Sequence, residues 1–384
     1  MATNSNIIQS NAEIFTDIAS ILTQQNKGTV QQALSNLMQQ LPIGSVANAI
    51  GNNFYGINHR QTPSAIQSNK DFFGLTFFTR PRMNFSTVNL RAERMFNSLL
   101  TGDTTSISRI IRCYLDSKIG ALEHVTSPLV DDQQAFIPIL TNTVLSVAGW
   151  PDVVAPTYTA TAGAYKEEFG FIDGTAKIFS SYDISASFRN VPGDPITMML
   201  LYWVYYASLV FEGVIVPYPE FIVENEIDYM CRIYRLVLDV TKTRVVGIAA
   251  NGACFPMSSP IGAKFNYEHD RPINNSNDQI TVSFRSYGAI YNDPKLIEQF
   301  NDTVVLFNGG MSDANRAQHY TMVPISALPI FNFKGYPRIN PDGNTLEWWV
   351  DTSIYQQMLP NVNSSKLFNS VNPNGQLSSL GNNV

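Results

Sequence analysis

Hydrophobic and polar residues alternate along residues 182–189, and a long apolar run follows soon afterwards. The alternating part reads YDISASFR and is typical of a half-buried antiparallel strand. Its apolar face consists of Ile184, Ala186 and Phe188. After the turn NVPG, Asp194 is placed to cap a helix that has Pro195 at its first position. Residues 196–211 are apolar almost all round, so we expect protein to cover most of this helix.

The apolar run does not fit a membrane span. It covers 16 residues, whereas a spanning helix needs about 20. No Lys or Arg flanks it directly, and its aromatic residues lie in the middle of the helix instead of at its ends. We therefore predict a core or subunit-interface helix and no membrane span.

A second stretch of the chain repeats this order of strand and helix. The residues ITVSFR, 280–285, alternate in the same way, and Asp293-Pro294 then opens the helix KLIEQF. An old duplication would explain the similarity, and so would two independent strands that each lead into a capped helix. The sequence leaves both explanations open.

The patterns before Trp150 are mainly helical. Residues 11–40 have helical periodicity, and residues 44–70 read as a loop or an arm. A strand over 72–80 ends at Pro81, because proline cannot donate to a ladder. Three further helices are predicted over 90–100, 107–122 and 133–147.

Beyond Trp150 short β-type segments dominate. Besides the strand at 182–189, the predicted strands are 157–162, 168–172, 176–179, 231–240, 245–250, 261–267, 280–289 and 345–350. Asp173-Gly174 predicts a hairpin turn, and Pro341-Asp342-Gly343 predicts another turn. This spacing favours an antiparallel sandwich or barrel, since too few helices alternate with the strands for a parallel sheet.

These elements predict an α+β fold, an antiparallel β-sandwich or barrel with an N-terminal helical region and inserted helices. Four segments are expected. They are an N-terminal helical arm and loop (1–70), a strand with a helical subdomain (71–150), an antiparallel β core with the packed helix 194–212 (151–330), and a C-terminal strand segment (331–384). From about residue 359 the last segment is uncharged and rich in Asn, Ser and Gly, so we expect a flexible tail.

The composition of the chain is typical of a protein that assembles with other subunits. Charged residues make up 15% of the chain, and Asn, Gln, Ser and Thr take their place. This suits a surface covered by neighbouring subunits, because interface cores are depleted in charge. The net charge of −6 argues against tight nucleic-acid binding through a basic groove. Three cysteines without CxxC spacing predict buried thiols in a reducing compartment, and the N-terminus has no signal-peptide pattern.

No pattern of catalytic or metal-binding residues stands out. The four histidines are scattered, and the one flanked by acids, His269, lies in a predicted loop. No phosphate-binding loop, GxSxG elbow or dinucleotide fingerprint occurs. A carbohydrate-active β-sandwich enzyme would need paired carboxylates beside exposed aromatic residues, and no such pair is evident. We expect no enzyme activity, no cofactor and no metal.

Four arginines are the candidate site residues. Arg80, Arg82, Arg189 and Arg285 each lie at the end of a predicted strand near aromatic residues. Guanidinium groups in such places often form paired hydrogen bonds with carboxylates across an interface. We predict inter-subunit contacts for them, with ordinary surface arginines as the alternative.

Residues 167–300 resemble the tube proteins of contractile bacteriophage tails. The resemblance lies in the strand ending in SFR, the proline-containing turn, the helix, and the later strand ITVSF. Gly247, Pro256 and Ser259-Pro260 occupy the places of that family's "V…G…P…SP" phrase. The phrases GLTFFTRPRMN and GYPRINPDGNTLEWW look like those of virion structural proteins of large phages.

The resemblance implies a β-barrel or sandwich subunit whose sheet continues into its neighbours around a hexameric ring. Such rings would stack into a tail tube, with the tail sheath, baseplate or neck proteins as further partners. DNA would pass through the lumen transiently and without specificity. The protein would be made in the host cytoplasm and reside in the virion. A baseplate, neck or other adaptor protein is the alternative, followed by a virion module that binds the host surface or carbohydrate.

Overall fold

The computed structural model describes residues 73–174, 180–265, 269–270 and 278–364. The predicted N-terminal arm, the predicted strand 176–179 and the chain beyond Ser364 lie outside these residues. The described part combines helices with antiparallel sheets, so the predicted α+β class is confirmed.

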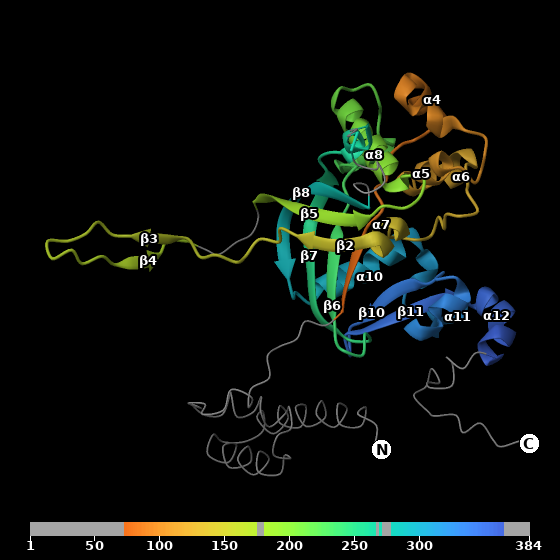
Figure 1. The fold of residues 1–384 in the computed structure, drawn as a ribbon. Helices are drawn as coiled ribbons and strands as arrows, with labels where there is room; N and C mark the ends of the chain where they lie inside the picture. The colour runs from red at the N-terminus through yellow and green to blue at the C-terminus, as the bar shows by residue number, and fades with distance from the viewer. Residues whose placement is uncertain (1–72, 175–179, 266–268, 271–277, 365–384) are drawn as a thin grey trace, which may run out of the picture. The chain divides into compact units, whose positions relative to one another are not determined.

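A six-stranded antiparallel sheet organises the fold (Figure 1). Its strands follow the order β1-β6-β7-β8-β5-β2. In chain order they are β1 (Gly74–Phe78), β2 (Val144–Ala148), β5 (Ser181–Arg189), β6 (Ile233–Leu238), β7 (Val245–Pro256) and β8 (Gln279–Tyr291). The two strands predicted as a repeat, β5 and β8, pair with each other and place Ile184 opposite Phe284.

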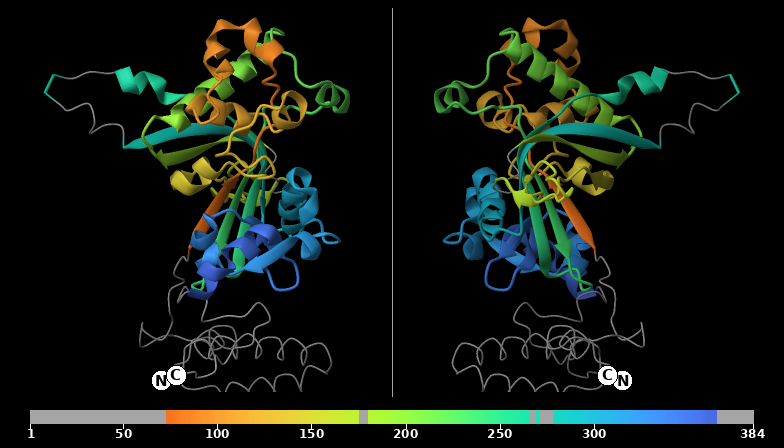
Figure 2. Two further views of the ribbon diagram at one scale, coloured as in Figure 1. Left: turned by 90° about the vertical axis from the view of Figure 1, so that its right-hand side faces the viewer. Right: turned by 90° about the vertical axis from the view of Figure 1, so that its left-hand side faces the viewer.

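The sheet curls strongly toward a barrel (Figure 2). Buried hydrophobic residues form a cluster on each of its faces. The successive residues Phe77 and Phe78 of β1 belong to different buried clusters. Because successive side chains of a strand point to opposite faces, both faces of this sheet must be covered.

Helices and a small sheet cover the two faces. One core contains residues of α8 (Pro195–Phe211) and of most of the short helices after β1, and the other contains residues of α10 (Lys295–Phe307). The short helices are α4 (Thr87–Ala92), η2 (Arg94–Leu100), α5 (Ile107–Leu115), α6 (Ile119–Glu123) and α7 (Pro138–Thr143). The small sheet, β10-β11-β9, consists of β9 (Tyr320–Val323), β10 (Tyr336–Asn340) and β11 (Thr345–Asp351).

The remaining elements are short, except the last. They are α9 (Pro219–Glu224), η3 (Pro260–Phe265), η5 (Gly309–Met311), α11 (Arg316–His319), η6 (Ile325–Phe331) and α12 (Thr352–Ser364). The helix α8 is largely covered, with Trp203 and Tyr206 fully buried, as predicted. Among the described helices, none combines the length and the apolar character that a membrane crossing requires.

The two strand-to-helix junctions differ from the predicted caps in one respect. Asp293 accepts a hydrogen bond from the Lys295 amide (2.9 Å) at the start of α10, where Pro294 occupies the N-cap position. Asp194 occupies the N-cap position of α8 but has a φ of 50° and makes no capping bond. Its carboxylate instead accepts a hydrogen bond from Asn190 Nδ2 (2.7 Å), which closes the turn before the helix.

Several predicted elements are wrong. The helix predicted over 133–147 ends at Thr143, and its C-terminal part is the strand β2. Residues 260–265 form the 3₁₀ helix η3, where a strand was predicted. The predicted helix 107–122 is split into α5 and α6, because Asp116 accepts hydrogen bonds from backbone amides between them. Residues 359–364, assigned to the flexible tail, continue α12.

Candidate assembly surface

The C-terminal end of the β1 edge of the main sheet is covered by its own chain. At the C-terminal end of β1, the Ile137 amide donates to the Phe78 carbonyl (2.8 Å) and the Arg80 amide donates to the Ala135 carbonyl (2.9 Å). Thr79 and Phe136 form an antiparallel bridge between these bonds. Residues 135–137 therefore occupy the hydrogen-bonding positions that another strand would need at this end of β1.

The Arg80 side chain holds this cover in place. It is buried, and its guanidinium donates to five backbone carbonyls of the surrounding loops. These belong to Cys113 (2.6 Å), Tyr114 (3.1 Å), Asp131 (3.3 Å), Asp132 (3.0 Å) and Gln134 (3.1 Å). Burial lowers the pKa of Arg80, an effect that the nearby Asp132 carboxylate opposes. The guanidinium thus binds backbone of its own subunit.

A second buried charge lies on the same side of the molecule. The Asp116 carboxylate accepts hydrogen bonds from the Phe85 amide (2.8 Å), the Tyr218 hydroxyl (2.9 Å), and the amides of Lys118 (3.0 Å) and Ile119 (3.1 Å). Burial raises its pKa to about 6, although these hydrogen bonds favour the ionised form. Asp116 links the segment after β1 to α6 and to the start of α9.

The opposite edge of the sheet, β2, is open. The strand pairs with β5 on one side and has no strand on its other side among the described residues. Its sequence VLSVA contains no charge and no proline. A bulge at Leu145, which is 46% exposed, interrupts the ladder, and regular pairing resumes at Ser146. Uncharged open edges readily pair with another chain, so β2 is a candidate for inter-subunit pairing.

A β-hairpin follows this edge directly. Gly149 ends β2 at a φ of 101°, and a side chain there would meet the Asp183 carbonyl oxygen at 2.3 Å. The chain then runs out into β3 (Thr157–Thr159) and β4 (Gly170–Ile172), which pair with each other and project away from the sheet (Figure 1). The tip turns at Gly163–Lys166. The Asp173-Gly174 turn was predicted to join strands 168–172 and 176–179, and the second of these lies outside the described residues.

The hairpin exposes a large apolar surface. All six residues of β3 and β4 are exposed. The exposed hydrophobic residues of this region are Val153, Val154, Tyr158, Tyr165, Phe169, Phe171 and Ile172. Isolated two-stranded hairpins are marginally stable in water, and apolar patches of this kind mark interaction sites. We define the open surface as β2 together with residues 150–174.

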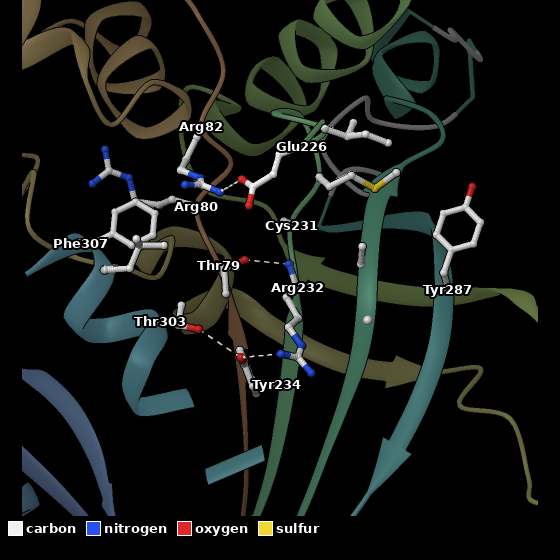
Figure 3. Close-up of a pocket in the computed structure, with 15 residues that line it drawn as sticks. Thr79, Arg80, Arg82, Glu226, Cys231, Arg232, Tyr234, Tyr287, Thr303 and Phe307 are labelled. Atoms are coloured by element: carbon white, nitrogen blue, oxygen red, sulfur yellow. Dashed lines mark hydrogen bonds and ion pairs between the residues drawn. The ribbon is translucent and has the colours of Figure 1, made fainter. Parts of the chain in front are cut away.

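A pocket is lined by the segment that follows β1, by residues before and in β6, and by residues of β7, β8 and α10 (Figure 3). Its volume is about 610 Å³. Arg82 pairs with Glu226 near one end, and at the other end Arg232 lies 5.0 Å from the Tyr234 ring and donates to its hydroxyl (3.2 Å). Glu226 is the one carboxylate among the described lining residues. Glycoside hydrolysis by two carboxylates would need a second one beside it.

The remaining predicted arginines lie in two different settings. Arg82 is stacked 4.5 Å over the Phe221 ring and pairs with Glu226 of its own chain. Arg285 pairs with Asp183 (2.9 Å), its direct cross-strand partner on β5. Arg189 is exposed at the end of β5. The structure therefore does not bring the four arginines together, and their inter-subunit role stays a prediction.

The described residues contain no cluster of His, Cys, Asp and Glu suited to a metal ion. What the open surface offers is backbone hydrogen-bonding groups and apolar side chains. Sequence reasoning missed β2, because Ile137, Leu140, Val144 and Val147 follow a helical spacing. The signal for a strand was the β-branched residues that precede Gly149.

Three solved structures are similar to part of the chain. The first is described as the anti-feeding prophage cap, a tube terminating cap (11% identity, TM-score 0.24, 41% of this chain and 82% of that chain). The second is the sheath/tube terminator of an extracellular contractile injection system (14%, 0.24, 41% and 88%), and the third is a sheath-tube complex of such a system (16%, 0.23, 41% and 82%). A comparison with curated proteins gives no match.

The family comparison covers most of the chain. Residues 17–365 match the family described as "Putative phage tail tube protein". This range includes both cores, the open surface and the small sheet. The chain therefore belongs to this phage tail tube protein family.

Proposed function

We propose that this protein is a structural subunit of a phage tail, and that copies of it assemble into stacked rings that form the tail tube. The observation that carries the proposal is the open surface, in which an edge that pairs with no further strand among the described residues continues into a projecting apolar hairpin. The role is structural and not catalytic, and the protein acts in the virion after synthesis in the host cytoplasm.

The two edges of the sheet favour a ring over a symmetric dimer. A dimer that pairs β2 with β2 would not by itself cover the apolar side chains of the hairpins, which would need a separate partner surface. Pairing of β2 with a different surface of the neighbour is a heterologous contact, and heterologous contacts close into rings or continue as helical stacks. A hairpin arm of about a dozen residues reaches up to about 40 Å, which is far enough to contact an adjacent subunit or ring.

The charge of the chain supports a conduit for DNA. The net charge is −6, and an acidic or neutral lumen would repel the phosphate backbone and let DNA slide. DNA would then be a transient, non-specific partner. A tube also needs proteins at its ends and around it, so sheath, baseplate or neck proteins are the further partners in this proposal.

Electron microscopy across a concentration series, together with the mass in solution, tests the proposal. Two chains are compared, the natural one and a variant in which residues 154–173 are replaced by a short Gly/Ser turn. The natural chain is expected to form rings or stacked rings with a central pore. The variant is expected to remain a folded monomer with a nearly unchanged melting temperature, because the hairpin makes few contacts with the body.

The outcomes distinguish a tube subunit from a baseplate, neck or adaptor protein. Single rings that never stack would support a baseplate, neck or adaptor role over a tube. A natural chain that stays monomeric at every concentration, also when tail initiation proteins are present, would overturn the proposal. Rings that form equally well from the shortened variant would remove the hairpin from the assembly surface.

A further inference from the structure

Two buried cysteines face each other across neighbouring strands. Cys231 and Cys254 are free thiols, and their sulfur atoms lie 3.3 Å apart. The two residues are direct partners in an antiparallel bridge. Each backbone amide donates to the carbonyl of the other residue, at 2.8 Å and 2.7 Å. The main chains thus hold the two thiols opposite each other.

The separation of the main chains fits a disulfide. Residues in a hydrogen-bonded antiparallel pair have Cα atoms about 5.5 Å apart, which lies within the range of disulfide-linked residues. Bond formation at about 2.05 Å requires the sulfur atoms to approach by about 1.2 Å from their 3.3 Å separation. Rotation of the two side chains can supply most of this movement.

The strand pairing is irregular next to the thiols, which gives the main chain room to adjust. Tyr234 pairs with Ala250, whereas Cys231 pairs with Cys254, so β7 contains one extra residue in between. The Asn251 side chain fills the gap, because its Oδ1 accepts a hydrogen bond from the Ile233 amide (2.7 Å). A bulge of this kind tolerates a small shift better than a regular ladder does.

The thiol pair lies beside the pocket described above. Cys231 is one of the residues that line the pocket of about 610 Å³ (Figure 3) and is 3% exposed, and Cys254 is fully buried. Burial and the hydrogen bond to Cys254 raise the pKa of the Cys231 thiol, which favours the protonated thiol and slows oxidation in a reducing compartment. The third cysteine, Cys113, donates a weak hydrogen bond to the Val125 carbonyl (3.6 Å) and is not part of this pair.

We propose that Cys231 and Cys254 are an oxidation site that forms an intrachain disulfide when the protein meets a hydroperoxide. The Cys231 thiolate attacks the peroxide, the O–O bond breaks, and a sulfenic acid and water form. The Cys254 thiolate then attacks that sulfur, and the hydroxyl group leaves as a second water. With hydrogen peroxide, two thiols and one peroxide thus give one disulfide and two waters.

The disulfide would tie the segment just before β6 to β7. It would close a loop between residues 23 positions apart, which constrains the unfolded chain and stabilises the folded one. A subunit built in a reducing cytoplasm would gain this stabilisation only after it reaches an oxidising environment. The inference does not depend on the stacked-ring proposal.

The test treats the reduced, purified full chain with a small excess of hydrogen peroxide. Intact mass is expected to fall by two hydrogen atoms, and peptide mapping without reductant is expected to join the Cys231 and Cys254 peptides. The melting temperature should rise by about 5–10 °C and return after treatment with dithiothreitol. The variant Cys113→Ser should behave like the natural chain, and Cys231→Ser and Cys254→Ser should lose the link and the shift.

Peptide mapping of the oxidised natural chain tests the proposal even if the cysteine variants fold poorly. The same oxidation in guanidinium chloride serves as its control, because an unfolded chain should also form links to Cys113. Native protein that links Cys113, or that accumulates oxidised Cys231 with Cys254 still free, would overturn the proposal. A disulfide that lowers the melting temperature would contradict its stabilising role.

Discussion

The two edges of the main sheet are treated in opposite ways. At the C-terminal end of β1 the chain folds residues 135–137 over the edge, and the buried Arg80 fixes that cover through five carbonyls. At β2 the edge has an uncharged sequence and leads directly into an exposed hairpin. The first edge is covered within the subunit at its C-terminal end, and the second pairs with no further strand among the described residues.

This difference indicates where stability and assembly reside. A sheet protein that remained a monomer would be expected to protect both edges with charges, prolines or covering loops. Here a buried guanidinium is devoted to one edge, while the other exposes seven apolar side chains from the hairpin region. We therefore expect changes on the covered side to alter folding and changes on the open side to alter assembly.

The largest effect is expected from Arg80→Met. The change leaves five carbonyls without their donor in a buried site, so the free energy of unfolding should fall by about 3–5 kcal/mol. Urea unfolding of the unassembled chain measures it. Arg189→Met is the matched control, because Arg189 is exposed and should change stability by less than about 0.5 kcal/mol. Equal losses in the two variants would contradict the assignment of Arg80 to the covered edge.

A pH-dependent effect is expected from Asp116→Asn. The pKa of Asp116 is raised to about 6 in the folded chain from an ordinary value of 3.8. The stability that this group contributes is therefore fully present below the ordinary value and is lost as pH rises through about 6. The destabilisation by Asn should be larger at pH 4.5 than at pH 7.5, by about 2 kcal/mol. Melting curves of the natural chain and the variant at the two pH values measure this destabilisation. A destabilisation that is larger at pH 7.5 than at pH 4.5 would contradict the prediction.

On the open side, we expect the double change Tyr158→Thr and Phe171→Thr to weaken assembly without unfolding the subunit. These residues are cross-strand partners and are 55% and 58% exposed. Threonine keeps the β-propensity while it removes apolar area, so the concentration needed for assembly should rise about tenfold or more. Light scattering against concentration measures it. Val88→Thr, on the exposed face of α4, should leave that concentration unchanged.

The smallest effect on stability is expected from Arg285→Met. Its ion pair with Asp183 joins side chains that are 39% and 45% exposed, so the loss should be at most about 1 kcal/mol. If Arg285 contacts a neighbouring subunit as predicted, Arg285→Met should weaken assembly more than it lowers the stability of the subunit. The variant Arg285→Lys should then retain part of the assembly. Assembly equal to that of the natural chain would remove Arg285 from the predicted contacts.

Much of the core could be predicted from the sequence. The alternation in YDISASFR and ITVSFR identified β5 and β8, and the apolar run identified α8, because burial on one face or on all faces leaves a periodic pattern. The sequence did not show that β5 and β8 pair with each other. Their similarity was local, whereas pairing is a long-range contact.

The site was harder to predict for physical reasons. The strand β2 is short and half-exposed, so its hydrophobic spacing matched a helix as well as a strand. Arg80 was singled out as an interface residue because of its place after a strand, but its five acceptors are backbone carbonyls, which no sequence pattern marks. The open surface was recognisable only once both edges of the sheet were in view.

Hydrogen–deuterium exchange of the free and the assembled protein tests the central claim most directly. In the free subunit, peptides from β2 and residues 150–174 should exchange quickly, while peptides from β1 and residues 135–137 should be protected. On assembly, the open surface should become strongly protected and the β1 edge should change little. Protection that appears at β1, with β2 and the hairpin still exchanging quickly, would contradict the account.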